Sequence, residues 1–147
     1  MLIWGVKESF RNYVKGSGGT IDVASPARSE ADRFAFPFAG SVDGELRYAG
    51  EVRFAAHGGM LSVAIIDPWI VFGPEEAALT VVDTDYLPDR SRRLPIARID
   101  TREPRAGASV EAAVALTVQG SRLLGDVYAP HTALDPVVFA IPAEGSP

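Results

Sequence analysis

Two side chains give this sequence most of its chemistry: the phenol of Tyr13 and the imidazole of His57. The chain has no cysteine and only two histidines, which excludes thiol catalysis, iron–sulfur clusters and cysteine-based zinc sites. Neither histidine lies in a recognised nucleophile motif, which argues against a hydrolase. Tyr13 and His57 are therefore the first candidates for a functional site.

Each candidate also has an interpretation that needs no ligand. Tyr13 taken alone is a helix residue that docks on a sheet, and His57 taken alone is a turn residue that caps backbone groups. Met60 is more often a core residue than a ligand, because thioethers fill irregular gaps. The acidic groups at 75–76 and 83–85 lack the spacing of a catalytic carboxylate pair or a calcium loop, so solvated loops explain them.

A helix at the start of the chain is predicted to position Tyr13. Residues 2–15 contain no proline and carry apolar or aromatic side chains at spacings of three and four, which is typical of a helix. The side chains along its predicted packing side are Val6, Phe10, Tyr13 and Val14. Gly16 ends this helix. Ser9 lies one turn before Tyr13 and borders the same side.

Beyond residue 19 the hydrophobic period changes to two, which predicts a mainly β chain with a minor helical part. The clearest strand is 45–56, with apolar and charged side chains on opposite sides. Gly58 and Gly59 predict a tight hairpin after it, so His57 is the last residue before the reversal, and 61–66 returns as the partner strand. Further strands are predicted at 69–72, 79–83, 94–100, 110–118, 122–128 and 137–141, with a solvated loop at 86–93. We expect an antiparallel β-sandwich or an open barrel, with the short N-terminal helix carrying Tyr13.

Composition limits the classes of function. A chain of 147 residues with 47% hydrophobic and 22% charged side chains is expected to fold as one domain over 1–142, with 143–147 as a disordered tail. The net charge of -5 argues against a nucleic-acid partner and against binding to an anionic membrane. The sequence has no signal peptide and no run of about 18 apolar residues, which predicts a cytoplasmic location and no membrane insertion.

Several segments together resemble the HtaA-type domain, which occurs in haem-uptake proteins of actinobacteria. They stand in the order of the family and span nearly the whole chain. The matching pieces are Trp4-Gly5-Val6-Lys7-Glu8-Ser9-Phe10-Arg11-Asn12-Tyr13-Val14, then Val52-Arg53-Phe54 leading to His57-Gly58-Gly59-Met60-Leu61 and Asp67-Pro68, and finally Val127-Tyr128-Ala129-Pro130 with Leu134-Asp135-Pro136-Val137.

The resemblance implies a mostly β domain that binds haem in a pocket. By motif position, Tyr13 is the expected axial iron ligand and His57 its hydrogen-bond partner, with Ser9, Val127 and Tyr128 at pocket-lining positions. The apolar macrocycle needs a cleft, for which Phe10, Met60 and Tyr128 are the expected lining and the hairpin tip the expected cover. The chain departs from the family at Val127, where an aromatic residue is usual. Family members are also usually exported, often with several domains and a membrane anchor.

A phenolate ligand suits ferric haem because it is hard and anionic. A free tyrosine has a pKa of about 10, so the anion at neutral pH needs both the iron and a hydrogen bond from a neighbouring imidazole. A second-shell group of this kind also orients its ligand. Single ligation by a phenolate is appropriate to a carrier, since reduction of the iron allows release.

We therefore predict a non-enzymatic protein that binds ferric haem b for carriage, uptake or buffering. Its expected partners are haem and a haem donor or acceptor protein, and the sequence allows a homodimer. The alternative is the same fold used as an interaction or small-ligand module without haem; a haem-degrading or peroxidatic enzyme ranks third.

His131 is an outside candidate for a sixth ligand, and the arginines at 90, 92 and 93 are outside candidates for the propionates. A secreted or cell-surface location is expected if the chain is one domain of a longer protein.

Overall fold

Two antiparallel sheets carry the fold in the computed structural model, which describes residues 1–143. Within those residues, ten strands form one sheet in the order β3-β4-β1-β13-β12-β11-β10-β9-β6-β5, and three form a second in the order β2-β7-β8. The strands are β1 (Leu2–Trp4), β2 (Thr20–Ala24), β3 (Arg28–Glu30), β4 (Arg33–Phe36), β5 (Phe38–Val42), β6 (Glu45–Tyr48), β7 (Glu51–Ala56), β8 (Leu61–Ile66), β9 (Trp69–Phe72), β10 (Ala77–Val82), β11 (Arg93–Ile99), β12 (Ser109–Leu116) and β13 (Ala133–Ala140). The helices are α1 (Glu8–Gly16) and α2 (Val118–Leu123), with short 3-10 turns η1 (His57–Gly59) and η2 (Thr84–Tyr86).

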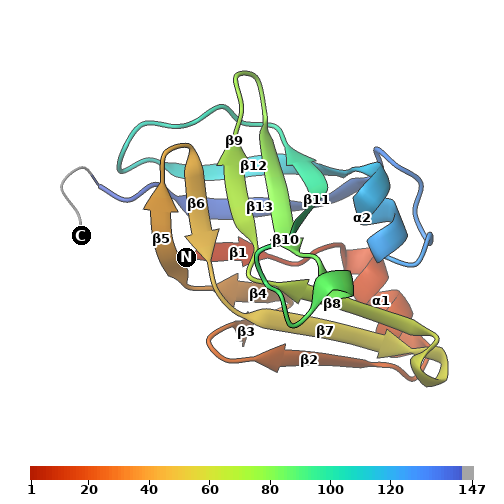
Figure 1. The fold of residues 1–147 in the computed structure, drawn as a ribbon. Helices are drawn as coiled ribbons and strands as arrows, with labels where there is room; N and C mark the ends of the chain where they lie inside the picture. Colours follow the sequence, from red (N-terminus) through yellow and green to blue (C-terminus); the bar gives the residue numbers. More distant parts are fainter. Residues whose placement is uncertain (144–147) are drawn as a thin grey trace.

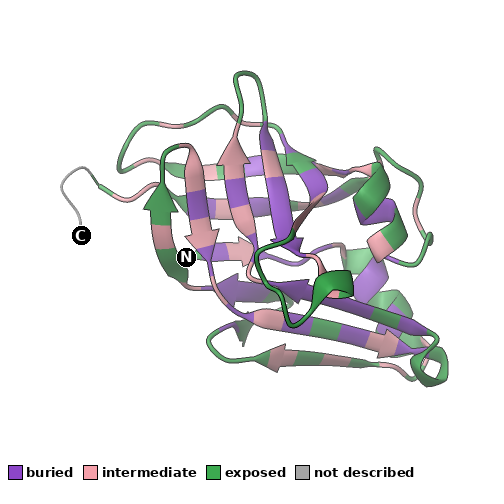
Figure 2. Ribbon diagram, viewed as in Figure 1, coloured by how far each residue is buried: buried purple, intermediate pink, exposed green. Residues whose placement is uncertain are grey.

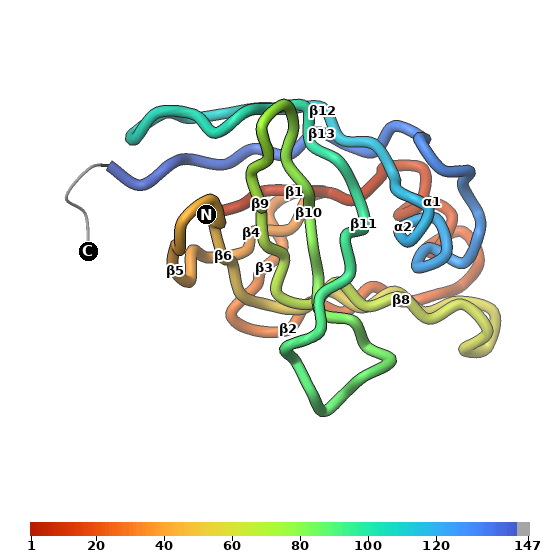
Figure 3. Tube along the Cα trace, turned by 45° about the horizontal axis from the view of Figure 1, so that its top comes forward, coloured from red at the N-terminus to blue at the C-terminus, as the bar shows by residue number. Residues whose placement is uncertain are grey.

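The larger sheet curls so that β12 and β13 lie behind β9 and β10, and the smaller sheet lies across one side of it (Figure 1). The core lies between these layers, where buried positions alternate with exposed ones along many strands (Figure 2). Helices α1 and α2 lie at the same end of the molecule as the tip of the β7–β8 hairpin (Figures 1 and 3). The predicted mainly β class is confirmed, and the described sheets remain open instead of closing into a barrel.

The first predicted helix begins later than its hydrophobic pattern indicated. Residues 2–4 form β1, which pairs with β13 on one side and β4 on the other. Leu2 and Trp4 are completely buried, because both side chains pack into the hydrophobic core. Val6 lies in the turn that follows, with φ of +64°, and is not part of the helix. The end of α1 at Gly16 agrees with the prediction.

The predicted strand 45–56 is two strands that belong to different sheets. Its buried side was predicted correctly, since Leu46, Tyr48, Val52 and Phe54 are all buried. The chain leaves the larger sheet after β6 and enters the smaller one at β7. Gly50, with φ of +128°, lies at this crossing, where its N–H donates to Asp67 Oδ1 at 2.9 Å.

The strand predicted at 122–128 is wrong, because this segment contains the end of α2 and a turn. Thr117 starts α2: its hydroxyl accepts a hydrogen bond from the Gly120 N–H at 3.0 Å and donates one to the Pro95 carbonyl at 2.7 Å. Gly120 packs so closely on β11 that a β-carbon there would overlap the Ile96 carbonyl. A tertiary contact therefore selects the helix where the local pattern indicated a strand.

The remaining strand predictions agree with the structure to within a few residues. They correspond to β8, β9, β10, β11, β12 and β13. Of the predicted tail, Ala143 is exposed and outside any regular element, and 144–147 lie outside the described residues. Among residues 1–143, no helix combines the length and the apolar character needed to span a bilayer.

Two glycine substitutions test the crossing between the sheets. Gly40 and Gly50 both have positive φ, so alanine is strained at either position by about 1–3 kcal/mol. A β-carbon at Gly50 would also lie 2.4 Å from Ala27 Cβ, whereas one at Gly40 would have nothing within 4 Å. We expect Gly50→Ala to lower the free energy of unfolding by about 1–3 kcal/mol more than Gly40→Ala, measured by urea denaturation. Equal losses for the two variants would contradict this account of the crossing.

Candidate functional site

Helix α1 presents Tyr13 at the surface from a well-anchored base. Its buried side consists of Phe10, Arg11 and Val14, and the Phe10 ring packs edge-on against Phe54 of β7 with centroids 5.1 Å apart. Tyr13 lies between Arg11 and Val14 in sequence but remains 39% exposed. The helix is therefore fixed through one side while Tyr13 projects from its edge.

The tip of the β7–β8 hairpin presents His57. The two strands pair up to Ala56 and Leu61, and the reversal between them takes place in η1. His57, Gly58 and Gly59 all have positive φ, at +54°, +65° and +92°. Two glycines tolerate such values without strain, and histidine is among the residues enriched there. The tip therefore turns tightly and leaves the imidazole exposed.

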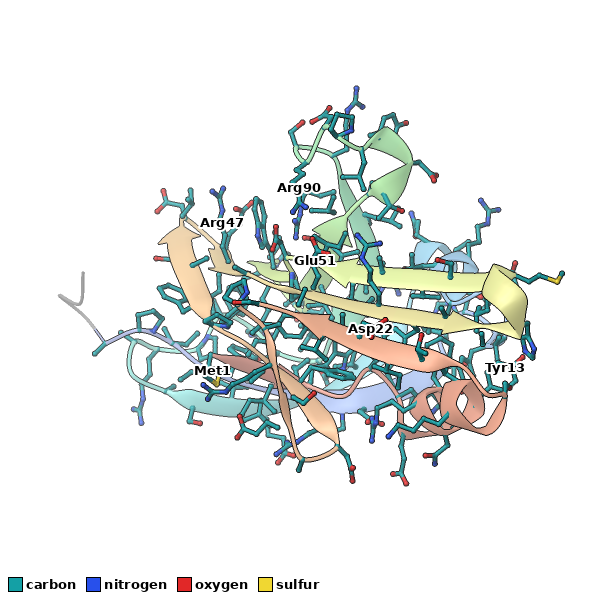
Figure 4. All side chains as sticks on the ribbon, turned by 90° about the horizontal axis from the view of Figure 1, so that it is seen from below. Met1, Tyr13, Asp22, Arg47, Glu51 and Arg90 are labelled. Carbon is teal, nitrogen blue, oxygen red and sulfur yellow. The ribbon has the colours of Figure 1, made fainter. Side chains whose placement is uncertain are left out.

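The Tyr13 hydroxyl and His57 Nε2 lie 2.7 Å apart, a hydrogen bond between residues 44 positions apart in the chain. The rings meet edge to face, with centroids 5.6 Å apart and planes inclined at 62°. Figure 4 shows Tyr13 beside the hairpin tip. The tautomer decides which atom donates: a neutral phenol donates to a bare Nε2, whereas a phenolate accepts only from Nε2–H. The geometry thus allows the imidazole to stabilise an anionic oxygen.

A second hydrogen-bonded pair lies one helical turn before Tyr13 and consists of two hydroxyls. Ser9 Oγ and the Tyr128 hydroxyl are 2.6 Å apart, and either can donate. The Tyr128 ring rests against Phe10, with centroids 6.4 Å apart, and the Lys7 ammonium lies 5.5 Å from its centroid. Ser121 Oγ donates a short hydrogen bond of 2.5 Å to the Tyr128 carbonyl. Tyr128 is therefore held at the ring, the hydroxyl and the backbone.

The other predicted site residues differ in what they offer to a ligand. Met60 is 91% exposed just after the hairpin tip, and Val127 is 42% exposed beside Tyr128. Phe10 has no exposed surface, so in this conformation it supports Tyr128 from behind instead of lining a cleft. An open hollow of about 360 Å3 adjoins Ser9 and is also lined by Lys7, Glu8, Asn12 and Asp135. The site is thus a surface with a hollow beside it.

The outside candidates belong to other parts of the molecule. His131 lines a hollow with Val118 and Gln119, and its backbone N–H donates to the Leu116 carbonyl. Arg90 pairs with Glu51 at 3.1 Å. Within residues 1–143, no group of three or more histidine or acidic side chains is arranged to hold a metal ion.

Arg92, in the loop before β11, and Arg93, the first residue of β11, make contacts of their own. The Arg92 guanidinium carbon lies 4.8 Å from the Tyr86 ring centroid, and that of Arg93 lies 3.8 Å from the ring of Trp69. Burial lowers the pKa of Arg93 to about 10, and the negative charge of Asp67 partly offsets this by raising the pKa. Arg93 also donates to the Thr80 carbonyl at 2.9 Å. These contacts give Arg93 a structural role on the sheet.

Sequence reasoning assigned no role to three side chains that shape the site. Lys7 lies over Tyr128, while Arg11 and Asp135 form an ion pair at 2.7 Å beneath the start of α1. Arg11 is 7% exposed, although a charged residue in a short helix is usually expected at the surface. In the sequence, Asp135 lies in the segment Leu134-Asp135-Pro136. This segment does not indicate that the partner of Asp135 lies near the N-terminus.

Comparison with known proteins identifies a family and solved structures that this chain resembles. A family model described as Htaa matches residues 1–140. The solved C-terminal domain of HtaA from Corynebacterium glutamicum is 27% identical, with a TM-score of 0.75 over 93% of this chain and 92% of that domain. The N-terminal domain of the same protein is 22% identical, with a TM-score of 0.76 over 97% and 96%. Heme binding protein HtaB from the same organism is 24% identical, with a TM-score of 0.77 over 93% and 89%, and these last two similarities indicate the fold alone. No protein with a curated description matches the chain significantly.

The exposure of the Tyr13–His57 pair predicts that it adds little to stability. An exposed hydrogen bond contributes about 0.5–1.5 kcal/mol at most, because water competes for both groups. We expect Tyr13→Phe and His57→Asn each to change the free energy of unfolding by less than about 1 kcal/mol, with asparagine chosen because it tolerates positive φ. Phe54→Ala, a change in the core beneath them, should cost about 3–5 kcal/mol in the same urea titration. A loss for either surface variant that approaches that of Phe54→Ala would give the pair a structural role instead.

Proposed function

The chain belongs to the HtaA family, and on that premise we propose that it binds ferric haem b, with the Tyr13 oxygen as the axial iron ligand and His57 as its hydrogen-bond donor. The role is carriage, uptake or buffering of haem, and not catalysis. The proposed binding unit comprises residues 1–142. Ser9, Met60, Val127 and Tyr128 form the surface that receives the ligand.

The observation that carries this proposal is the 2.7 Å contact between the Tyr13 hydroxyl and His57 Nε2. Both side chains are exposed, so a ligand can reach the phenol oxygen without opening the core. Tyrosine is one of the residues that ligate haem iron in proteins, and it does so as the anion. A neighbouring Nε2–H donor stabilises that anion and orients the ring, which is the role proposed for His57.

The side chains around the pair suit the two chemical parts of haem. Met60 and Val127 expose apolar surface that a porphyrin face would cover. Ser9 lies four residues before Tyr13, about 6 Å along the helix, and shares a hydrogen bond with Tyr128. A carboxylate accepts hydrogen bonds from hydroxyls, so these two groups are proposed to bind a propionate. Phe10 acts indirectly by supporting the Tyr128 ring.

Haem degradation and peroxidation need groups that move protons at the iron. Among the side-chain hydrogen bonds and ion pairs of the described residues, Tyr13 and His57 join only each other, which favours the proposed carrier role. The proposed partners are haem and a protein that donates or accepts it. Formation of a homodimer stays a prediction.

A second function keeps the fold without haem, as an interaction or small-ligand module. It is favoured by Val127, which stands where the family usually has an aromatic residue and so offers less stacking surface. The two functions differ in one property, the response of the purified protein to hemin.

A hemin titration separates them. Wild-type protein should give a saturable Soret band, and Tyr13→Phe should abolish it because the axial oxygen is lost. We expect His57→Asn to weaken binding about 10–100-fold, the usual effect of losing a second-shell partner. Tyr86→Phe is the matched control, since this tyrosine is 50% exposed on η2 and should leave the titration unchanged. A wild-type protein that leaves the hemin spectrum unaltered would end the haem proposal and favour the second function.

Reduction should release the ligand. The anionic oxygen proposed at Tyr13 prefers ferric iron, so dithionite is expected to accelerate transfer of haem to apomyoglobin. Gallium protoporphyrin is the control, because its metal is not reduced under these conditions and its transfer rate should be the same with and without dithionite. Stopped-flow absorbance and fluorescence measure the two rates. Haem transfer that is insensitive to reduction would argue against ligation by the phenolate.

A further inference from the structure

We infer that Asp135 is the positioning residue for Tyr13: from β13 it fixes where α1 begins, and thereby where the Tyr13 hydroxyl meets His57. Asp135 does not contact the Tyr13–His57 pair in any hydrogen bond or ion pair of the described residues. Its effect on ligand binding rests on the proposed function, whereas its effect on the pair itself does not.

Both carboxylate oxygens of Asp135 are engaged by the first turn of α1. Oδ1 accepts a hydrogen bond from the Glu8 N–H at 3.0 Å, and Oδ2 accepts one from Arg11 Nη1 at 2.7 Å. The side chain of the N-cap residue, Lys7, makes no capping hydrogen bond to the helix. The free N–H groups of a helix's first turn need acceptors, and a negative charge there is favourable. A residue more than 120 positions away in the chain therefore caps this helix.

The backbone of Asp135 holds the turn that leads into the helix. Its N–H donates to the Val6 carbonyl at 2.9 Å, and its carbonyl accepts from Trp4 Nε1 at 2.8 Å. Val6 has φ of +64°, which is unfavourable for a β-branched residue and persists only where surrounding contacts determine it. The strained turn and the helix start are thus held by one residue.

Arg11 closes the arrangement from inside the helix. Its guanidinium is buried and donates to the Gly5 carbonyl at 2.7 Å as well as to Asp135. The contact is close, since a β-carbon on Gly5 would lie 2.4 Å from Arg11 Nη1 and 2.8 Å from Asp135 Oδ2. Gly5, Arg11 and Asp135 therefore form a clamp that we name the helix clamp.

The helix clamp acts on Tyr13 because α1 is short. The helix has nine residues, and Tyr13 follows Arg11 by two positions. A shift or rotation at the clamp therefore moves the Tyr13 hydroxyl relative to the hairpin that holds His57. A hydrogen bond of 2.7 Å weakens when its atoms separate beyond about 3.2 Å, so a small displacement is enough. Phe10 also anchors the helix, through Phe54, so the helix clamp is tested in variants that leave Phe10 and Phe54 unchanged.

The test in the ligand-free protein is the 15N signal of the His57 ring nitrogens. The chain has two histidines, so assignment needs only one histidine variant. Asp135→Ala is expected to shift the His57 signal to that of Tyr13→Phe, which lacks the hydroxyl. Asp67→Ala is the matched control: its carboxylate likewise accepts from a backbone N–H, that of Gly50 at 2.9 Å, and from an arginine, Arg90 at 3.4 Å, but it lies at the crossing between the sheets. This control should keep the wild-type signal.

A folded Asp135→Ala protein with the wild-type His57 signal would overturn the inference. If that variant does not fold, Asp135→Asn decides instead, because an amide has one oxygen and can replace only one of the two acceptors that Glu8 and Arg11 use. Its His57 signal should lie between those of wild type and Tyr13→Phe, and an unchanged signal would again overturn the inference.

Hemin titration supplies the second readout. Asp135→Ala should weaken hemin binding about tenfold or more, as second-shell changes do, while Asp67→Ala stays within about twofold of wild type. An equal loss of affinity in both variants would show a general effect of stability and contradict positioning. If wild-type protein binds no hemin, the proposed function fails, while the His57 signal still decides the role of Asp135.

Discussion

The hydrogen bond between Tyr13 and His57 requires that the end of a helix and the tip of a hairpin meet at one place on the surface. The hydrogen bond itself contributes too little free energy to hold the two elements together, because both groups are exposed to water. The rest of the fold positions them. Asp135 of β13 fixes the start of α1, and Phe10 joins the helix to Phe54 on β7, the strand that leads directly to His57. Tyr13 and His57 are thus connected through the core.

Local patterns predicted the parts of the fold that local forces determine. The alternation along 45–56, the double-glycine reversal and the end of α1 at Gly16 all agree with the structure. Three segments were predicted wrongly, and each is decided by distant partners. Residues 2–4 are a strand because β4 and β13 enclose them, Gly50 divides one predicted strand because the chain changes sheet there, and α2 forms where Gly120 packs on Ile96. Local sequence patterns do not indicate which distant segments pair with these residues.

The candidate site shows the same division. Family motifs indicated Tyr13, His57, Ser9 and Tyr128, and the structure brings them together as two hydrogen-bonded pairs. Phe10 was expected to line a cleft, and in the structure it is fully buried against Phe54 of β7. Arg11 and Asp135 received no role, since their ion pair joins positions 124 apart. The sequence thus indicated the candidate ligand-binding residues, but it did not indicate the residues that position them.

The exposure of the pair agrees with the proposed carriage of haem. A phenol oxygen at the surface can be reached and left without unfolding the core, and apolar groups such as Met60 and Val127 lie on exposed surface of the same chain. The most direct measurement is a crystal structure of the protein with ferric haem. The account predicts an iron–oxygen bond to Tyr13 with His57 Nε2 still hydrogen-bonded to that oxygen; haem held elsewhere, for example by His131, would contradict it.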